Sequence, residues 1–368
     1  MISSNNLGPS SEAASADSIM MRRCLELAAQ GAGRTSPNPM VGSVVVKDGK
    51  IIGEGFHPQA GQPHAEVFAL RAAGDATPGA TLYVNLEPCN HTGRTPPCTE
   101  AVIKAGIVRV VIGMTDPNPK ASGGIERLQA AGVEVITGVE TAACKRLNEA
   151  FIHRIRQQQP FSILKYAMTL DGKIATDTGH SAWVTSPEAR QQVHQLRSTC
   201  DAVIVGGNTV RQDNPHLTSH GVSDHNPLRV VMSRRMELPA VANLWQTDIA
   251  PTLVFTENCP QTSLLPSQVE IISLPSLTPT AVLDTLYKRG VSTVLWECGG
   301  TLSAAALRQG VIQKIWAFIA PKLIGGQQGY TPIGNMGFKQ MNEALMLDQT
   351  ELTKVGPDWL IQGYLRNS

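Results

Sequence analysis

QPHAEVFAL at residues 62–70 decides the fold of the first half of this chain. Pro63 stands where helices begin, so His64 and Glu66 fall in the first turn of a predicted helix. Cys89 follows a predicted strand at 81–86, and Cys98 opens a predicted helix that Gly106 ends. The pattern places all three potential ligands where a strand ends or a helix begins, which is where α/β sheets carry their chemistry.

The three residues His64, Cys89 and Cys98 offer one imidazole and two thiolates. Catalytic zinc takes three such ligands and keeps a fourth position for water, whose pKa falls to roughly 7. Glu66 is not needed as a ligand, so it is the natural proton carrier. The alternatives are unrelated cysteines or a structural zinc site, which usually needs four protein ligands; His91 is the residue that could close such a site.

The composition favours two domains that act on a small molecule. The chain has 368 residues, of which 42% are hydrophobic, and its net charge is +1, so no polyanion-binding surface is indicated. No apolar run reaches the length of a membrane span, and the first residues resemble neither a signal nor a transit peptide. The seven cysteines show no disulfide-scaffold spacing. We therefore expect a cytoplasmic protein that binds neither nucleic acid nor membrane.

Strand and helix patterns alternate along the whole chain, which predicts two α/β domains. We place the boundary at the glutamine run before Pro160, giving domains 16–158 and 159–368. In the first domain we expect helices at 18–30, 98–106, 125–131 and 140–156, besides the His64 helix, and strands at 44–46, 51–52, 81–86, 108–112 and 134–136. In the second we expect strands at 161–168, 202–205, 228–232, 252–255, 291–296 and 314–320, helices at 188–197, 279–289 and 302–309, and loops at 219–226 and 260–279.

Polar and glycine-rich segments follow several strands of the second domain. Gly299 and Gly300 open a predicted helix after the strand 291–296, where backbone N–H groups can hold a phosphate. Similar segments lie at 170–175, 181–186 and 205–210. Each one alone is also explained as a plain turn. The sequence has no G-x-G-x-x-G motif, so a standard Rossmann dinucleotide unit is not indicated.

These motifs together resemble the bifunctional riboflavin-biosynthesis deaminase/reductase family. The resemblance rests on segments 64–66, 86–98, 116–119, 170–172, 183–186, 297–300 and 319–322. It implies a cytidine-deaminase-like three-layer α/β/α domain and a dihydrofolate-reductase-like α/β domain. It also implies zinc, NADPH, a homo-oligomer and two reactions. These are deamination of 2,5-diamino-6-(5-phosphoribosylamino)pyrimidin-4(3H)-one and NADPH-dependent reduction of the ribosyl side chain of the product, which gives 5-amino-6-(5-phosphoribitylamino)uracil.

The resemblance assigns candidate site residues to both domains. In the deaminase, Glu66 is catalytic, zinc is bound by His64, Cys89 and Cys98, and substrate contacts come from Asn38, His57, His91 and Arg94. In the reductase, the cofactor contacts are Ala167, Trp183, Thr209, Asp213, Arg234, Gly299, Gly300, Thr301, Leu302, Ser303, Ala304 and Ala305. The substrate contacts there are Ser181, Arg197, Leu217, His220 and Glu297.

Two departures from the family pattern bear on function. His220 stands where the family usually carries Arg, which weakens one expected phosphate contact. Ser233-Arg234-Arg235 replaces the usual Asp-Ser or Asp-Thr, and the two cations suit the NADPH 2′-phosphate. The remaining alternatives are a deaminase with a degenerate reductase half, a tRNA or nucleoside deaminase, and a non-enzymatic zinc scaffold.

Overall fold

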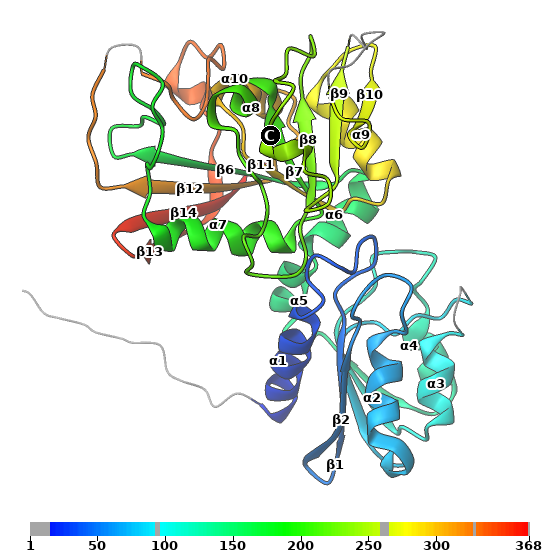
Figure 1. Cartoon of the computed structure of the whole chain (residues 1–368). Helices are drawn as coiled ribbons and strands as arrows, with labels where there is room; N and C mark the ends of the chain where they lie inside the picture. Colours follow the sequence, from blue (N-terminus) through cyan, green and yellow to red (C-terminus); the bar gives the residue numbers. More distant parts are fainter. Residues whose placement is uncertain (1–14, 93–95, 258–264, 327–328, 367–368) are drawn as a thin grey trace, which may run out of the picture. The chain divides into compact units, whose positions relative to one another are not determined.

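The computed structural model describes residues 15–92, 96–257, 265–326 and 329–366 (Figure 1). Two compact units divide between Asn148 and Glu149, and segment 32–39 belongs to the second unit. The division lies earlier than the expected boundary at 158/159, because helix α6 (Glu149–Gln157) packs on the second unit. There the Arg154 guanidinium donates to the carbonyls of Val291 and Tyr287 at 2.7 and 2.9 Å.

The first unit is a five-stranded sheet between two helical layers, in the order β2-β1-β3-β4-β5. Its strands are β1 (Gly42–Lys47), β2 (Lys50–Phe56), β3 (Thr81–Leu86), β4 (Arg109–Met114) and β5 (Glu134–Thr137). Helices α1 (Ala16–Ala29) and α5 (Thr141–Leu147) cover one face, and α2 (Ala65–Ala73), α3 (Cys98–Lys104) and α4 (Gly124–Ala130) cover the other (Figure 1). The one-turn helix η1 (Gly74–Ala76) follows α2. The expected three-layer α/β/α fold is confirmed.

Glycines let both helical layers approach this sheet closely. A Cβ on Gly42 would lie 2.1 Å from the Cys24 carbonyl oxygen of α1. On β2, a Cβ on Gly53 would lie 2.3 Å from the Ala69 carbonyl oxygen of α2. Larger residues at either position would push a helix away from the sheet, and with α2 the His64 and Glu66 that stand at its start.

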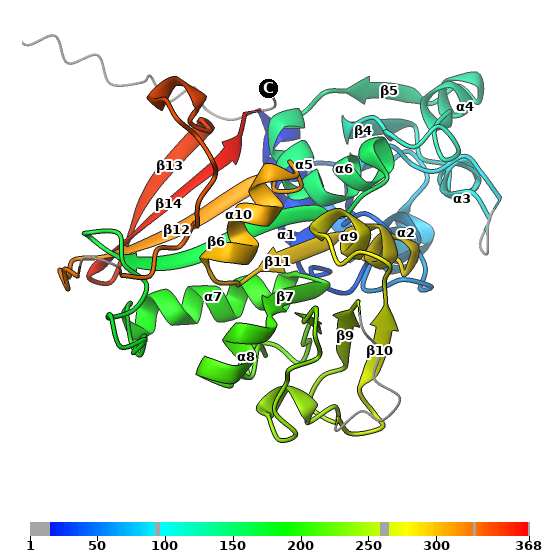
Figure 2. The same cartoon turned by 90° about the horizontal axis from the view of Figure 1, so that it is seen from above.

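The second unit is a nine-stranded sheet in the order β10-β9-β8-β7-β11-β6-β12-β14-β13 (Figure 2). Pairing is parallel from β10 to β12 and antiparallel from β12 through β14 to β13. The strands are β6 (Phe161–Thr169), β7 (Ala202–Gly206), β8 (Leu228–Met232), β9 (Thr252–Thr256), β10 (Glu270–Ser273), β11 (Thr293–Trp296), β12 (Lys314–Ala320), β13 (Leu347–Val355) and β14 (Asp358–Leu365).

Helices cover both faces of this sheet and bury its apolar strands. Helices α7 (Pro187–Thr199) and α8 (Gly207–Asp213) pack into one core cluster with η2 (Asn243–Trp245). On the opposite face, α9 (Pro279–Lys288) and α10 (Gly300–Arg308) pack around the fully buried Trp296. The short helix η3 (Met341–Glu343) precedes β13. The expected second α/β domain is confirmed.

Four features differ from the sequence-based expectation. Helix α8 spans Gly207–Asp213, where a loop after the strand at 202–205 was wrongly expected. Strand β10 lies inside segment 260–279, which was wrongly expected to be a loop, because its backbone pairs in parallel with β9. The hairpin β13–β14 was not predicted. The single helix expected at 140–156 is broken at Asn148, whose side-chain amide bonds both the N–H and the carbonyl oxygen of Met40 at 2.8 and 2.9 Å.

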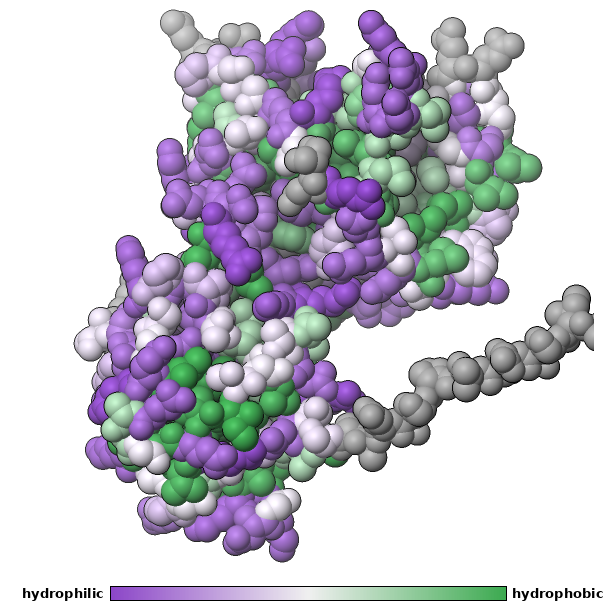
Figure 3. Space-filling view, turned by 180° about the vertical axis from the view of Figure 1, so that it is seen from behind, coloured by the Kyte–Doolittle hydropathy of each residue, from purple (hydrophilic) through white to green (hydrophobic). Residues whose placement is uncertain are grey.

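The surface carries both hydrophobic and hydrophilic residues. In Figure 3, hydrophobic residues gather in a patch on the first unit and in smaller groups on the second, with hydrophilic residues around them. Within the ranges that the structure describes, no helix combines the length and the apolar character that crossing a bilayer requires.

Candidate active sites

The potential metal ligands of the first unit converge in space. Their ligand atoms all lie within 4.8 Å of one another, with His64 Nδ1 3.2 Å from Cys98 Sγ and 3.5 Å from Cys89 Sγ. His64 directly precedes α2, Cys98 is the first residue of α3, and Cys89 follows β3. The fold therefore gathers residues far apart in the sequence at one edge of the sheet.

This donor set fits a zinc ion. Tetrahedral zinc with bonds of about 2.0–2.3 Å places its ligand atoms roughly 3.5 Å apart. A hydrogen bond from Cys98, helped by His64, lowers the pKa of the Cys89 thiol despite its burial, so this sulfur is already disposed to bind a cation. Among the described residues the group has three members, and His91 is not one of them.

Glu66 lies beside the ligands, and its carboxyl group is almost completely buried at 3% exposure. Burial raises the pKa of Glu66 to about 7, and the charge of Cys89 adds to the effect. Its Oε2 has no hydrogen-bond partner among the described residues. A buried carboxyl oxygen without a partner next to a metal-ligand set is the arrangement expected of a group that awaits a ligand.

Two further residues hold the ligand segments in place. Glu87 accepts backbone hydrogen bonds from Gly123, Gly124 and Ile125 through Oε1, at 3.0, 2.8 and 3.3 Å. A Cβ on Gly124 would lie 2.0 Å from the Pro88 carbonyl oxygen, so only glycine fits there. Sequence reasoning missed both roles; the visible signal was a glutamate directly before the Pro88-Cys89 pair.

The predicted deaminase substrate contacts are placed unequally. His57 is buried, donates a hydrogen bond from Nδ1 to the Pro63 carbonyl oxygen at 3.0 Å, and packs edge-on to His64 with ring centroids 5.6 Å apart. His91 is exposed, at the end of the described loop. Arg94 lies outside the described residues, and Asn38 belongs by its contacts to the second unit.

A cleft of about 900 Å³ crosses the carboxyl ends of the strands in the second unit. Nine predicted contacts line it, namely Ser181, Thr209, Asp213, Arg234, Gly299, Gly300, Thr301, Leu302 and Ala305. Four predicted cofactor residues do not line it. Ser303 and Ala304 are buried in the core, Ala167 packs there from β6, and Trp183 is 69% exposed with Arg190 over its ring.

The two glycines at the start of α10 differ in role. A Cβ on Gly300 would lie 2.6 Å from the Thr331 carbonyl oxygen, so this position must be glycine for the 331–334 segment to pass. A Cβ on Gly299 would meet no atom within 4 Å. Gly299 therefore leaves its backbone open to the cleft, as binding of a phosphate at this point requires.

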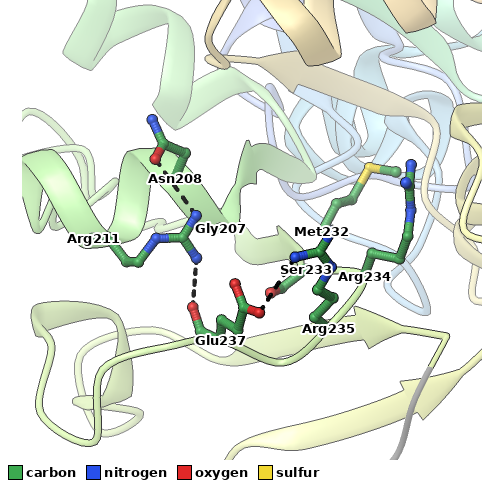
Figure 4. A pocket seen from close by; sticks show the side chains of 8 residues that line it. All are labelled: Gly207, Asn208, Arg211, Met232, Ser233, Arg234, Arg235 and Glu237. Carbon is green, nitrogen blue, oxygen red and sulfur yellow. Dashed lines mark hydrogen bonds and ion pairs between the residues drawn. The ribbon is translucent and has the colours of Figure 1, made fainter.

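A basic side pocket adjoins one end of the cleft, and the two share Gly207, Asn208, Met232 and Arg234. Figure 4 shows Arg211 and Arg235 on either side of Glu237, with Arg234 next to Met232. Arg235 and Arg234 are 75% and 70% exposed, and their ion pairs with described residues are long, at 3.6 Å to Glu237 and 3.7 Å to Glu257. Arg211, which the sequence did not single out, comes from α8.

A second set of charges is buried at the end of β11. Arg197 donates to both oxygens of Glu297, at 2.5 and 3.0 Å, and Lys165 lies 3.7 Å from the same carboxylate. Burial opposes the ionisation of Glu297, but the two cations outweigh it and lower its pKa to about 2. Sequence reasoning missed Lys165, although a lysine within an apolar strand is a visible signal.

Comparison with known proteins covers both units. Residues 14–114 match the family described as the cytidine and deoxycytidylate deaminase zinc-binding region, and residues 160–361 match the RibD C-terminal domain. The riboflavin biosynthesis protein RibD of Synechocystis is 60% identical over 95% of this chain and 96% of that protein. The chain belongs to the RibD family.

Solved structures agree with this assignment. A diaminohydroxyphosphoribosylaminopyrimidine deaminase/5-amino-6-(5-phosphoribosylamino)uracil reductase from Thermotoga maritima has a TM-score of 0.87 at 38% identity, covering 95% of this chain and 99% of that one. RibD of Acinetobacter baumannii gives a TM-score of 0.86 at 38% identity, covering 96% and 99%. As a RibD-family protein, the chain is a bifunctional deaminase and reductase of riboflavin biosynthesis whose cofactors are zinc and NADPH.

Proposed function

We propose that the first unit deaminates 2,5-diamino-6-(5-phosphoribosylamino)pyrimidin-4(3H)-one and that the second reduces the ribosyl group of the product with NADPH. The observation that carries the proposal is the buried, partnerless Glu66 oxygen beside the His64, Cys89 and Cys98 ligand atoms. The Thermotoga maritima protein is named for both activities, which supports the same substrates here.

Glu66 has the properties that a proton carrier for deamination needs. His64, Cys89 and Cys98 would hold the zinc ion, which would supply the attacking water by lowering its pKa to roughly 7. The Glu66 carboxylate accepts a proton from the attacking water and delivers it to the ring nitrogen. It then takes the proton of the hydroxyl group newly formed on the ring carbon and passes it to the departing amine, so that the hydroxyl becomes a carbonyl as ammonia leaves. Its burial keeps bulk water from competing for that proton. His57, packed against His64, fixes the orientation of the ligand ring.

The reductase cleft has separate places for cofactor and sugar. Bound NADPH supplies the hydride. The Gly299 backbone and Thr301, at the start of α10, lie where they can bind its diphosphate, and Asp213 holds Ser181 through a 3.2 Å hydrogen bond at the cleft wall. Arg197 and Glu297 are proposed to face the phosphoribosyl group. The protein's task is to align the sugar carbon with the nicotinamide.

The function is tested by supplying the diaminopyrimidine with and without NADPH and following ammonia and NADPH oxidation separately. We expect ammonia in both reactions and NADPH oxidation only after deamination. Ammonia without oxidation would leave a deaminase with a silent reductase half. Ammonia from cytidine or tRNA, but not from the phosphoribosyl substrate, would contradict the proposal.

The basic side pocket is proposed to bind the NADPH 2′-phosphate. Replacing both Arg234 and Arg235 with Ala is expected to raise the KM for NADPH by roughly 10- to 100-fold, the loss of one or two charge-assisted hydrogen bonds. The KM for NADH should change little, because NADH lacks this phosphate. Steady-state kinetics with both cofactors measures the difference. Arg289→Ala, which removes an exposed pair with Glu270, is the control, and equal effects on both cofactors would refute the assignment.

The cellular setting is also a proposal. The six described cysteines are all free thiols, which suits the reducing cytoplasm. The family resemblance supports a homo-oligomer and a small-molecule substrate rather than nucleic acid. Sedimentation of the purified chain and fractionation of the producing cell would test these two points.

A further inference from the structure

Three histidine rings lie together beside the Arg197–Glu297 pair and outside the residues that line the cleft. His194 lies on α7, one turn before Arg197, while His216 and His220 lie on the loop after α8. The rings of His194 and His220 stack, with centroids 4.2 Å apart and planes at 23°. The ring of His216 stands edge-on to His220 at 6.1 Å.

Two arginine side chains donate hydrogen bonds to the backbone of the loop that carries His216 and His220. Arg197 donates to the Thr218 carbonyl oxygen at 3.1 Å, and the fully buried Arg229 donates to that of His216 at 3.4 Å. Leu217 and His220 have φ values of 55° and 50°, a left-handed conformation that persists only where surrounding contacts enforce it. The backbone is therefore fixed, and the rings of His216 and His220 are presented to solvent.

The ring nitrogens are available to a ligand. Within the described ranges, none of the three rings forms a hydrogen bond through a nitrogen; His220 bonds only through its backbone N–H, to Thr218 Oγ1 at 3.4 Å. Unpaired imidazoles grouped at a solvent-facing position can donate up to six N–H groups when protonated. Such donors match the oxygens of a phosphate.

Burial and the neighbouring cations both disfavour protonation of His194 and His220. Arg190 and Arg197 face it from α7, Glu297 from the end of β11, and Lys165 of β6 is paired with that same glutamate. Burial, with the neighbouring His220 and Arg197, lowers the pKa of His194 to about 4, and burial with Arg197 and His216 lowers that of His220. A bound dianion would reverse this balance, because it attracts the proton that the cations repel.

We propose that His194, His216 and His220 form a proton-dependent site for the phosphomonoester of the reductase substrate, and that the imidazoles take up a proton from solvent as the phosphate binds. The inference rests on the proposed reductase function. His220 stands where the family usually carries Arg, and the sequence alone predicts a weaker phosphate contact there. Under this proposal the contact is kept, but it depends on pH. A permanent guanidinium there would bind without proton uptake.

The affinity for the phosphorylated substrate should then fall as pH rises. In the free protein the pKa values of His194 and His220 lie below the ordinary histidine value, and the phosphate raises them in the complex. Binding therefore weakens between these two values, by up to about tenfold per pH unit. Above pH 7 the phosphate itself stays a dianion, since its second pKa is about 6.

Calorimetry of the full chain measures the proton directly. We would titrate 5-amino-6-(5-phosphoribosylamino)uracil without NADPH at pH 7.5, in two buffers of different ionisation enthalpy. Net proton uptake is expected for the wild type. It should disappear with the dephosphorylated ligand, which carries the same ring and sugar.

Two variants of His220 distinguish the effect of the ring's charge from that of its shape. His220→Arg is expected to bind at least as tightly as the wild type with reduced proton uptake and a flatter pH profile. His220→Gln should bind roughly tenfold more weakly, also with reduced uptake, a loss comparable to one charge-assisted hydrogen bond. His225→Gln is the control, since His225 contacts the Cys200 carbonyl oxygen away from this cluster. It should retain the wild-type uptake.

Three results would overturn the inference: no uptake by the wild type, equal uptake with the dephosphorylated ligand, or unchanged uptake in both His220 variants. These outcomes are distinct from a failure of the proposed function. In that case NADPH would not be oxidised by any variant, whatever its pH profile. If the wild type reduces the substrate but binds it without linked protons, only the histidine inference fails.

Discussion

Glu66→Gln is expected to retain zinc and to lose ammonia release, by roughly 100- to 10,000-fold. Glutamine fills the same buried space beside the ligands but cannot accept the proton of the attacking water. The three ligand side chains are unchanged, so the metal content should stay near one zinc per chain. Ammonia release with the diaminopyrimidine and zinc analysis of the same preparation measure both quantities.

Two controls make this result specific. Glu100→Gln alters an exposed carboxylate in the same unit, paired with Arg127, and should leave the rate nearly unchanged. NADPH oxidation with already deaminated substrate should be normal in Glu66→Gln, because that reaction belongs to the second unit. Ammonia release at the wild-type rate would show that another group moves the proton, and zinc loss would show a structural role.

Glu297→Gln is expected to destabilise the second unit by about 3–5 kcal/mol and to abolish reduction. The change leaves Arg197 and Lys165 buried without their counter-charge, which costs far more than an exposed pair contributes. All five tryptophans lie in the second unit, and Trp296 is adjacent to Glu297 and fully buried. Urea unfolding followed by tryptophan fluorescence therefore reports on this unit.

A matched exposed pair calibrates the effect. Glu270→Gln breaks the exposed pair with Arg289 and should cost no more than about 1 kcal/mol. The pKa of Glu297 is lowered to about 2 from an ordinary value near 4.5, so its contribution is fully present above pH 4.5 and is lost as pH falls toward 2. The stability difference between wild type and Glu297→Gln should shrink over that range. Equal costs for both variants would mean that the buried charges are solvated.

Sequence patterns predicted those parts of the fold whose signal is local. Short apolar runs separated by other segments predicted the strands from β6 to β9. Pro63 and Gly106 marked where α2 begins and α3 ends. The hairpin β13–β14 escaped because most side chains of β13 are exposed, so the alternation that marks a half-buried strand is missing. Strand β10 escaped because proline-rich loop composition surrounds its four residues.

The site residues likewise divide into those with a local sequence signal and those without one. His64, Glu66, Cys89 and Cys98 could be named from residue type and spacing alone, because zinc accepts few ligand types and the proton carrier stands two positions from one of them. The place of Arg211 in the basic pocket, the pairing of Lys165 with Glu297 and the stacking of His194 on His220 could not be predicted in this way. Each depends on which strand lies next to which in the sheet.

The sequence by itself therefore determined the chemistry available to this protein: a zinc-ligand set with a proton carrier, and strand-end loops able to bind a dinucleotide. The tertiary structure alone decided which charged side chains pair with each other and which remain available to a ligand. Arg197 meets Glu297 across 100 residues because β11 lies between β6 and β7, and this pairing occupies much of the arginine's fork. Such contacts depend on how strands distant in the sequence pair in the sheet, and local sequence patterns do not predict this pairing.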